Sequence, residues 1–378
     1  HGGQNLTMIE FINDGLMTVF FLLVGLEIKR ELLVGELSSF RKAALPFIAA
    51  CGGMLFPVLV YSFVCAPGTP GGQGLAIPMA TDIAFSLGVL SLLGKRVPLS
   101  LKIFLTAFAV VDDIGGILVI AVFYSSHVAY GYLLVAILLL ILLYFIGKRT
   151  VANKLFFLVI GVVIWYLFLQ SGIHSTIAGV LLAFVIPAKP QLRAGRYIER
   201  IRRIINTFPV MGENDIVLTN EQIAQLKRVE SASDRVISPL QSLEDNLHGV
   251  VNYIILPLFA FVNAGVVFSG GGEVIGEVSI AVALGLLCGK FLGIYFFTWL
   301  AVKSKLTPMP QGMDWKNIAG VALLGGIGFT VSLFIANLSF GVTHPVLLNQ
   351  AKFGVLSGTA LAGILGYIVL YLVLPKKR

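Results

Sequence analysis

Long apolar runs are the feature that most constrains what this chain can fold into. Of its 378 residues, 57% are hydrophobic and only 12% are charged. A helix needs about 20 mostly apolar residues to cross about 30 Å of hydrocarbon, and runs of that length fill most of the sequence. A run such as residues 130–147, YGYLLVAILLLILLYFIG, lacks the period of two expected of barrel strands. The sequence therefore predicts an all-α integral membrane protein.

The apolar runs predict about eleven transmembrane helices. Threading them alternately across the bilayer puts 25 of the 27 lysines and arginines on one side, which the positive-inside rule identifies as the cytoplasm. We therefore expect a multi-pass protein with a cytoplasmic C-terminus. The predicted spans are 9–33, 44–64, 75–94, 99–124, 130–147, 155–170, 173–187, 249–269, 277–303, 317–340 and 350–374.

The net charge of +8 does not indicate a nucleic-acid partner. Nucleic-acid binding requires the basic residues to form one solvent-facing groove or stripe, whereas here they follow the loops between spans. The expected environment is instead the lipid bilayer. There are two exceptions, Lys352, which opens the last span near the outer face, and Lys290, which lies in the middle of its span and alone needs a special explanation.

One polar region, residues 188–248, interrupts the apolar pattern and is predicted to be a cytoplasmic insertion within a single transmembrane domain covering 1–378. Between Arg196 and Ile205, apolar and arginine residues fall on opposite faces of a predicted helix. Such a helix fits either an anionic membrane surface or a packed position on the transporter. A second helix is predicted to start at Thr219, with Gln222 completing a capping box.

The predicted spans contain two matching triplets, 44–124 and 277–374, which enter the membrane from opposite sides. The middle span of each is interrupted: one contains Pro78, Thr81 and Asp82, and the other a glycine-rich break. Paired interruptions in inverted repeats predict a transporter binding site where the broken helices cross at mid-membrane. Close helix packing through small residues is the alternative. The glycines of the second break are Gly325, Gly326 and Gly328.

Four charged residues are predicted near mid-membrane: Asp82, Asp112, Asp113 and Lys290. Each costs at least about 2.5 kcal/mol to insert, so such residues generally mark ion pathways. Two close carboxylates resist joint ionisation, which suits one of them to carry a proton. A deprotonated carboxylate, with a hydroxyl such as that of Thr81, supplies the hard oxygen ligands that sodium prefers. We therefore predict that sodium and protons compete at Asp112 and Asp113.

Structural roles are the alternatives for the other two charges. Lys290 could form an ion pair with one aspartate that only fastens helices. Asp82 and Lys290 could also neutralise the partial charges at the ends of the broken helices, and for Asp82 this structural role is the preferred interpretation.

These motifs resemble the NhaA family of bacterial sodium/proton antiporters over nearly the whole chain. The family's order of signatures is matched by FINDGLMTVFFLLVGLEIKREL, AIPMATDIAFSLGVL, LKIFLTAFAVVDDIGG, SGIHSTIAGV, LPLFAFVNAGV and GGIGFTVSLFIA. The rule on paired interrupted helices was drawn in part from this family. The resemblance implies an electrogenic, pH-regulated exchanger of the bacterial inner membrane. It would move cytoplasmic sodium or lithium out and protons in by alternating access, for sodium and pH homeostasis, and would need no cofactor.

The resemblance also implies roles for individual residues. Asp112 and Asp113 match the cation and proton site, Thr81 and Asp82 the first broken helix, and Lys290 the buried lysine that pairs with Asp112. A cytoplasmic pH-responsive cluster is implied at Glu27, Arg30, Glu31, Glu244 and His248.

Three further expectations follow from comparison with the family pattern. The insertion at 190–245 is longer than expected, and Phe291 follows the buried lysine where the family often has proline. The family usually forms homodimers of twelve-helix subunits, and most of its first helix and dimer-forming hairpin would precede His1.

Two alternatives to an antiporter are a cation channel and an intramembrane aspartyl protease. A channel does not need inverted repeats with broken helices. A protease of that kind would carry its two aspartates on different helices, one of them in a Gly-x-Gly-Asp context, which VVDDIGG does not match.

Overall fold

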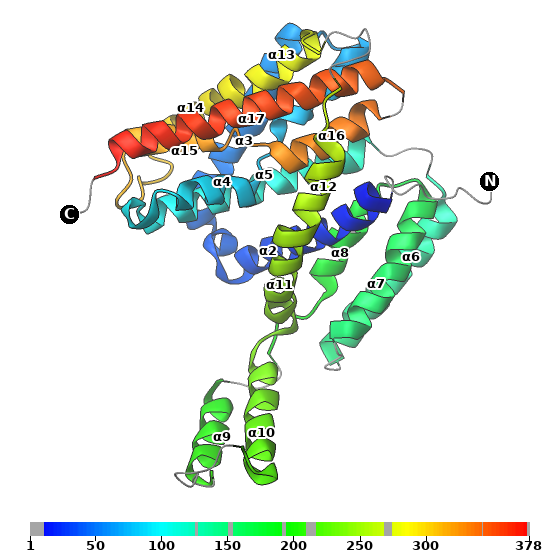
Figure 1. The fold of residues 1–378 in the computed structure, drawn as a ribbon, viewed down its shortest axis with the longest axis vertical. Helices are drawn as coiled ribbons and strands as arrows, with labels where there is room; N and C mark the ends of the chain where they lie inside the picture. Colours follow the sequence, from blue (N-terminus) through cyan, green and yellow to red (C-terminus); the bar gives the residue numbers. More distant parts are fainter. Residues whose placement is uncertain are drawn as a thin grey trace.

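The computed structural model describes residues 11–124, 128–149, 154–190, 194–208, 217–267, 274–341 and 343–375, and all of its described elements are helical. Most helices form one large bundle, and a hairpin of two helices projects from it (Figure 1). Among the described residues, seven helices are long and apolar enough to cross a membrane, or nine if each of two bent pairs counts as one span.

Nine elements make up the first half of the bundle, including the first bent pair. The first described element is a π-helical turn, η1. The helix α3 continues through two internal prolines, Pro46 and Pro57. The elements are η1 (Phe11–Leu16), α2 (Met17–Val34), η2 (Glu36–Ser38), α3 (Phe40–Val64), η3 (Pro70–Gly74), η4 (Ile77–Met79), α4 (Ile83–Ser91), η5 (Gly94–Arg96) and α5 (Leu99–Phe123).

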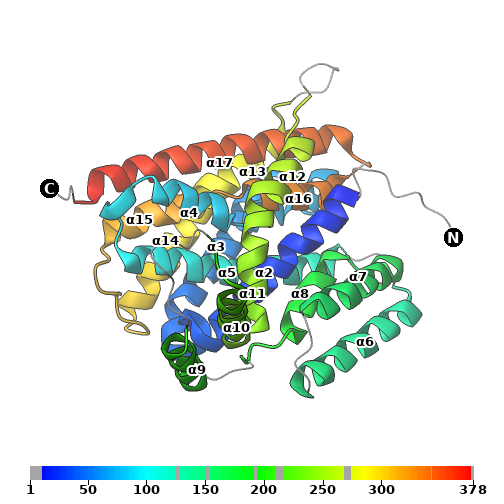
Figure 2. The ribbon, with the colours of Figure 1, turned by 60° about the horizontal axis from the view of Figure 1, so that its bottom comes forward.

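A side group of three helices packs beside α2. α8 lies along α2, while α6 and α7 form a pair at the edge of the molecule (Figure 2). Their shared core includes Leu26, Phe157 and Leu182. These helices are α6 (Tyr130–Arg149), α7 (Lys154–Ser171) and α8 (Thr176–Val185).

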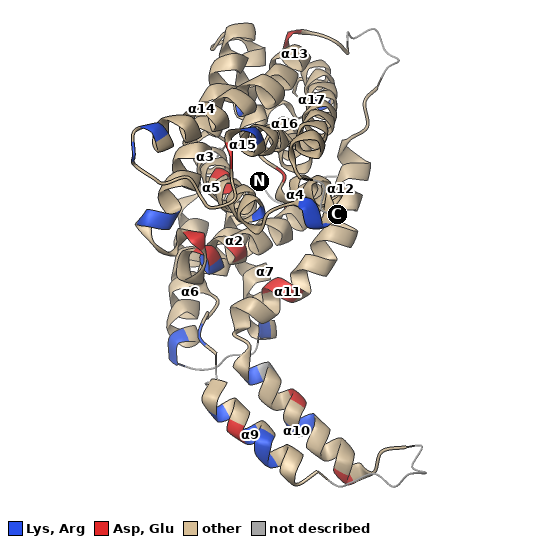
Figure 3. Ribbon diagram, turned by 90° about the vertical axis from the view of Figure 1, so that its left-hand side faces the viewer, with Lys and Arg blue, Asp and Glu red and all other residues tan. Residues whose placement is uncertain are grey.

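The projecting hairpin consists of α9 (Ala194–Asn206) and α10 (Asn220–Val236), and the chain returns to the bundle through α11 (Pro239–Val250) (Figures 1 and 3). The capping box predicted at Thr219 and Gln222 is confirmed. α11 continues through η6 (Val251–Ile255) into α12 (Leu256–Asn263) as one apolar stretch. The helix that contains the predicted span at 249–269 therefore begins about ten residues earlier, at Pro239, and Leu240 and Leu243 of its first turns are buried.

The last part of the chain packs against the first. α14 runs along α3, and α17 packs on both α13 and α15. A second core, which includes Phe108, Ile294 and Val321, lies between these helices. The elements are α13 (Glu277–Leu284), the π-helical η7 (Gly285–Gly289), α14 (Lys290–Lys303), α15 (Trp315–Leu324), α16 (Phe329–Phe340) and α17 (Pro345–Val373).

Candidate ion-exchange site

Two broken helices meet at the centre of the bundle. The first bends by 46° between the turns at 70–79 and α4, and the second by 45° between α15 and α16. Pro78 lies in the turn before the first break, and the predicted glycines Gly325, Gly326 and Gly328 lie in the second. The backbones touch where they break, since the N–H of Asp82 donates to the carbonyl of Ile327 at 2.7 Å.

Hydroxyl groups from each broken helix satisfy carbonyls left free in the other. Thr81 donates to the carbonyl of Gly325 at 2.8 Å and Ser86 to that of Leu324 at 3.0 Å. In the opposite direction, Ser332 of α16 donates to the carbonyl of Ile77 at 2.8 Å. A buried carbonyl without a partner is costly, so these contacts hold the two breaks together.

Asp82 joins the same two helices through its carboxylate. One oxygen accepts the N–H of Phe85 at 3.1 Å and so caps α4, and the other accepts the N–H of Thr330 at 3.2 Å and also its hydroxyl. Negative charge is favourable at a helix N-terminus, and Asp82 lies at the starts of both α4 and α16. Asp82 is thus placed as a connector of the two breaks.

Lys290 lies beside this crossing and is completely buried. Its ammonium forms an ion pair with Asp112 of α5 and donates to the hydroxyl of Thr81 at 2.9 Å. The other carboxylate oxygen of Asp112, Oδ1, is buried and has no hydrogen-bond partner among the described residues. Buried polar atoms are seldom left without a partner, so this oxygen is available to a ligand.

Asp113 is the next residue on α5 and faces a different direction, because successive helical residues are about 100° apart. Its side chain is 7% exposed, and no residue that the structure describes donates a hydrogen bond to it or pairs with it. A methyl group added at Gly116, one turn further along α5, would meet no atom within 4 Å. Asp113 is therefore a carboxylate whose oxygens have no donor within the described ranges, on a helix that borders open space at Gly116.

Tight backbone packing fixes the position of Lys290. α14 crosses α3 at two glycines, and a Cβ atom built on Gly293 would lie 2.0 Å from the carbonyl oxygen of Gly52. The π-helical turn η7 ends directly before Lys290, and such turns are frequent at functional sites. Phe291 continues α14 without a break, and its ring stacks on Tyr295 at 5.8 Å.

Comparison with known proteins identifies the family. Residues 1–370 match the sequence model described as Na+/H+ antiporter 1. The chain belongs to this antiporter family. Proteins named Na(+)/H(+) antiporter NhaA are 85% identical to it in Bacteroides fragilis, 82% in Bacteroides thetaiotaomicron and 63% in Phocaeicola vulgatus. Each alignment covers the whole of this chain and 86%, 86% and 84% of the respective relative.

The antiporter is therefore a secondary transporter of sodium and protons and not an enzyme. Its many apolar helices make it a multi-pass membrane protein. The channel and the aspartyl protease are set aside, because the family and these relatives are named as antiporters.

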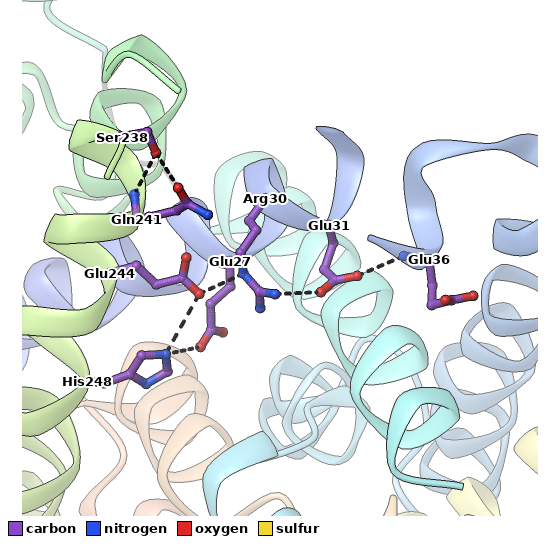
Figure 4. Close-up of polar contacts among 8 residues, drawn as sticks. All are labelled: Glu27, Arg30, Glu31, Glu36, Ser238, Gln241, Glu244 and His248. Atoms are coloured by element: carbon purple, nitrogen blue, oxygen red, sulfur yellow. Dashed lines mark hydrogen bonds and ion pairs between the residues drawn. The ribbon is translucent and has the colours of Figure 1, made fainter. Parts of the chain in front are cut away.

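The predicted pH-responsive residues of the antiporter lie together where α2 meets α11 (Figure 4). Arg30 pairs with Glu244 across the two helices at 2.8 Å and with its neighbour Glu31 at 3.2 Å. His248 lies 3.4 Å from Glu27 and 3.8 Å from Glu244, measured from its Nε2 atom to a carboxylate oxygen. Glu244 therefore contacts both a permanent cation and a group that titrates near neutral pH.

Sequence reasoning missed the polar partners of the broken helices. Ser86, Thr330 and Ser332 provide the hydroxyls that join the two breaks. The available signal was a small hydroxyl residue one turn or less beyond each predicted break. In an apolar span, such a residue can donate to a carbonyl on a neighbouring helix.

Proposed function

We propose that exchange takes place at Asp113 and Asp112, beside the crossing of the two broken helices. The observation that carries this proposal is the contrast between the neighbouring carboxylates. Asp112 is held by Lys290 and has one free oxygen, whereas Asp113 has no partner in the described part of the chain. Hard oxygen atoms of this kind suit a sodium ion.

Charge balance connects sodium binding with proton release. A buried site tolerates little change in net charge, so an entering sodium ion favours loss of a proton from Asp113. The same ion competes with the Lys290 ammonium for Asp112, which favours loss of the lysine proton. The release of two protons for each sodium ion that binds transfers one net charge in each transport cycle, so exchange is electrogenic. In this scheme Thr81 positions Lys290, and its hydroxyl oxygen also lies within reach of the cation.

We assign the crossing to two inverted repeats, 44–124 and 277–374, in a bundle of eleven spans. The nearly equal bends and the reciprocal hydroxyl contacts support this arrangement. Alternating access would then move the crossing relative to α2 and α8. The seven long helices and the two bent pairs of the described residues make nine spans. The helices α2 and α8 bring the number to eleven, although α8 is only ten residues long.

The remaining assignments follow from charge distribution and resemblance. The positive-inside pattern supports a cytoplasmic C-terminus and a cytoplasmic location for 188–248. The bacterial inner membrane, transport of lithium and the homodimer rest on the family resemblance. Control of exchange by pH is assigned to the cluster of Glu27, Arg30, Glu31, Glu244 and His248.

The decisive experiment uses vesicles that contain the purified protein and an internal pH dye. Asp113→Asn and Asp112→Asn should each abolish sodium-driven proton movement, because each removes a titratable oxygen. The matched control is Asp245→Asn, which changes an exposed aspartate of α11 and should leave exchange intact. Normal exchange in either site variant, with normal insertion, would overturn the assignment.

A further inference from the structure

The projecting hairpin contains a pocket that the exchange of sodium and protons does not require. It has a volume of about 620 Å3 and lies between the C-terminal half of α9 and α10. Its lining includes three arginines, Arg200, Arg203 and Arg228, and the amide side chains of Asn206 and Gln225. This volume lies within the range of small-molecule sites, about 300–1,000 Å3.

The pocket is strongly positive. No carboxylate lines it, and none of the three arginines forms an ion pair within 4 Å with any residue of the described ranges. A helix C-terminus normally offers free carbonyls that repel anions. Here Thr207 caps the end of α9, with its hydroxyl and its N–H both donating to the carbonyl of Arg203.

The hairpin holds the backbones that carry the three arginines in fixed relation to one another, although the arginines come from two helices. Tyr197 of α9 and Ser233 of α10 form a hydrogen bond of 2.8 Å between their hydroxyls. Ile204 and Ala232 are buried, and the capping box at Thr219 fixes the start of α10. A ligand therefore does not have to bring the two helices together and only has to order the exposed arginine side chains, which lowers the entropic cost of binding.

We propose that this pocket binds an anion that carries two or more phosphate charges. The guanidinium group has a planar set of donors that can bind two phosphate oxygens at once. Three guanidinium groups carry more positive charge than a ligand with a single carboxylate would neutralise. Asn206 and Gln225 add neutral donors at the same place. The phosphate can belong to a soluble diphosphate compound or to the headgroup of an anionic lipid.

The test is calorimetric titration of pyrophosphate into the full chain, held in nanodiscs of neutral phosphatidylcholine. The double variant Arg203→Gln/Arg228→Gln should weaken binding about tenfold or more, since each change removes a charge-assisted contact. Arg202→Gln is the matched control, because Arg202 is exposed on α9 but does not line the pocket. It should change the affinity less than twofold.

A second arm identifies the source of the phosphate. In nanodiscs that contain anionic phosphatidylglycerol, weaker pyrophosphate binding would assign the pocket to a lipid headgroup, and unchanged binding would assign it to a soluble ligand. Both results require the pocket to bind phosphate.

Three outcomes would overturn the proposal. The first is absence of pyrophosphate binding to the unaltered chain, and the second is an equal loss in Arg202→Gln, which would indicate diffuse charge. The third concerns Glu213 and Asp215, which belong to the segment 209–216 outside the described residues. Binding that occurs only in Glu213→Gln/Asp215→Asn would mean that the chain's own carboxylates occupy the pocket.

Discussion

Asp82 and Asp113 are both buried aspartates near the helix crossing, but their oxygens have different surroundings. Asp82 accepts hydrogen bonds from the starts of α4 and α16, whereas Asp113 has no donor among the described residues. A carboxylate surrounded by backbone donors is stabilised as an anion and has little capacity left for a cation. We therefore expect Asp82 to contribute to stability and Asp113 to transport.

Asp82→Ala should destabilise the protein by about 2–4 kcal/mol, because it removes a helix cap and charge-assisted hydrogen bonds. Thermal unfolding in detergent measures this as a lower midpoint temperature. Asp82→Asn should lose less, since its amide oxygen can still cap α4. If Asp82→Ala were fully stable while its sodium affinity collapsed, Asp82 would be a cation ligand instead.

The residue types of the site could be predicted from the sequence, but most of their contacts could not. A buried charge is conspicuous in an apolar span, which is why Asp112, Asp113 and Lys290 stood out. Thr330 and Ser332 do not stand out, because a hydroxyl is tolerated almost anywhere in a membrane helix. Their importance depends on which carbonyls the neighbouring helix leaves free, and this is a property of the assembled bundle.

At the scale of elements, the contact between α3 and α14 has no space for a side chain at its crossing. Gly293→Ala would place a methyl group 2.0 Å from the carbonyl oxygen of Gly52. The helices must separate, and we expect a loss of about 1–3 kcal/mol in stability together with slower exchange, since α14 carries Lys290.

The control for this prediction is Gly131→Ala in α6, where a new methyl group meets no atom within 4 Å. It should be neutral or slightly stabilising, because alanine favours helix more than glycine does. Unfolding temperature and vesicle exchange are compared for the two variants. Equal unfolding temperatures and equal exchange rates in the two variants would show that the α3–α14 contact has space for a methyl group.

The contact between α2 and α11 should respond to pH through His248. The carboxylates of Glu244 and Glu27 hold the pKa of His248 above its ordinary value of about 6.5, so below this raised pKa the ring is positive and attracts both of them. As pH rises through this raised pKa the charge is lost, and the two carboxylates are left to repel each other beside Arg30. The contact between the helices should therefore weaken as pH rises.

His248→Ala or Glu244→Gln should consequently displace the pH profile of the maximal exchange rate without abolishing exchange. The maximal rate is measured at saturating sodium, where competition between sodium and protons at the transport site disappears. Asp245→Asn, adjacent to Glu244 but exposed, is the control. Identical profiles in all variants would mean that the cluster is only a set of solvated charges.

Helices could be predicted from hydropathy more reliably than their ends and partners. The amphipathic pattern of α9 fits a membrane surface as well as another helix, and in the structure Ile204 is buried in the hairpin with α10 while Ile198 and Ile205 stay exposed. The start of α11 was missed because its first turns are polar on one side. Hydropathy measures average polarity, and it does not identify what covers an apolar face.

At the scale of the whole molecule, the proposed stoichiometry moves net charge across the bilayer. A potential of 100 mV is worth about 2.3 kcal/mol per charge, which corresponds to a change of roughly 50-fold in the sodium gradient at equilibrium. Vesicles of known orientation, clamped with potassium and valinomycin, should show this shift. A gradient that does not change with potential would establish electroneutral exchange.

The interlocked breaks also affect how the protein is made. Thr81 contacts Gly325 and Asp82 contacts Thr330, which follow them by 244 and 248 residues. Ribosomes add about 5–20 residues per second, so the first broken span waits roughly 12–50 s for these partners. During that interval, a carboxylate and several carbonyls at its centre lack their final contacts in a medium that cannot solvate them. The first half of the nascent chain therefore has to stay close to the insertion machinery or to water until the second half arrives, and slower translation between the two halves should increase its degradation.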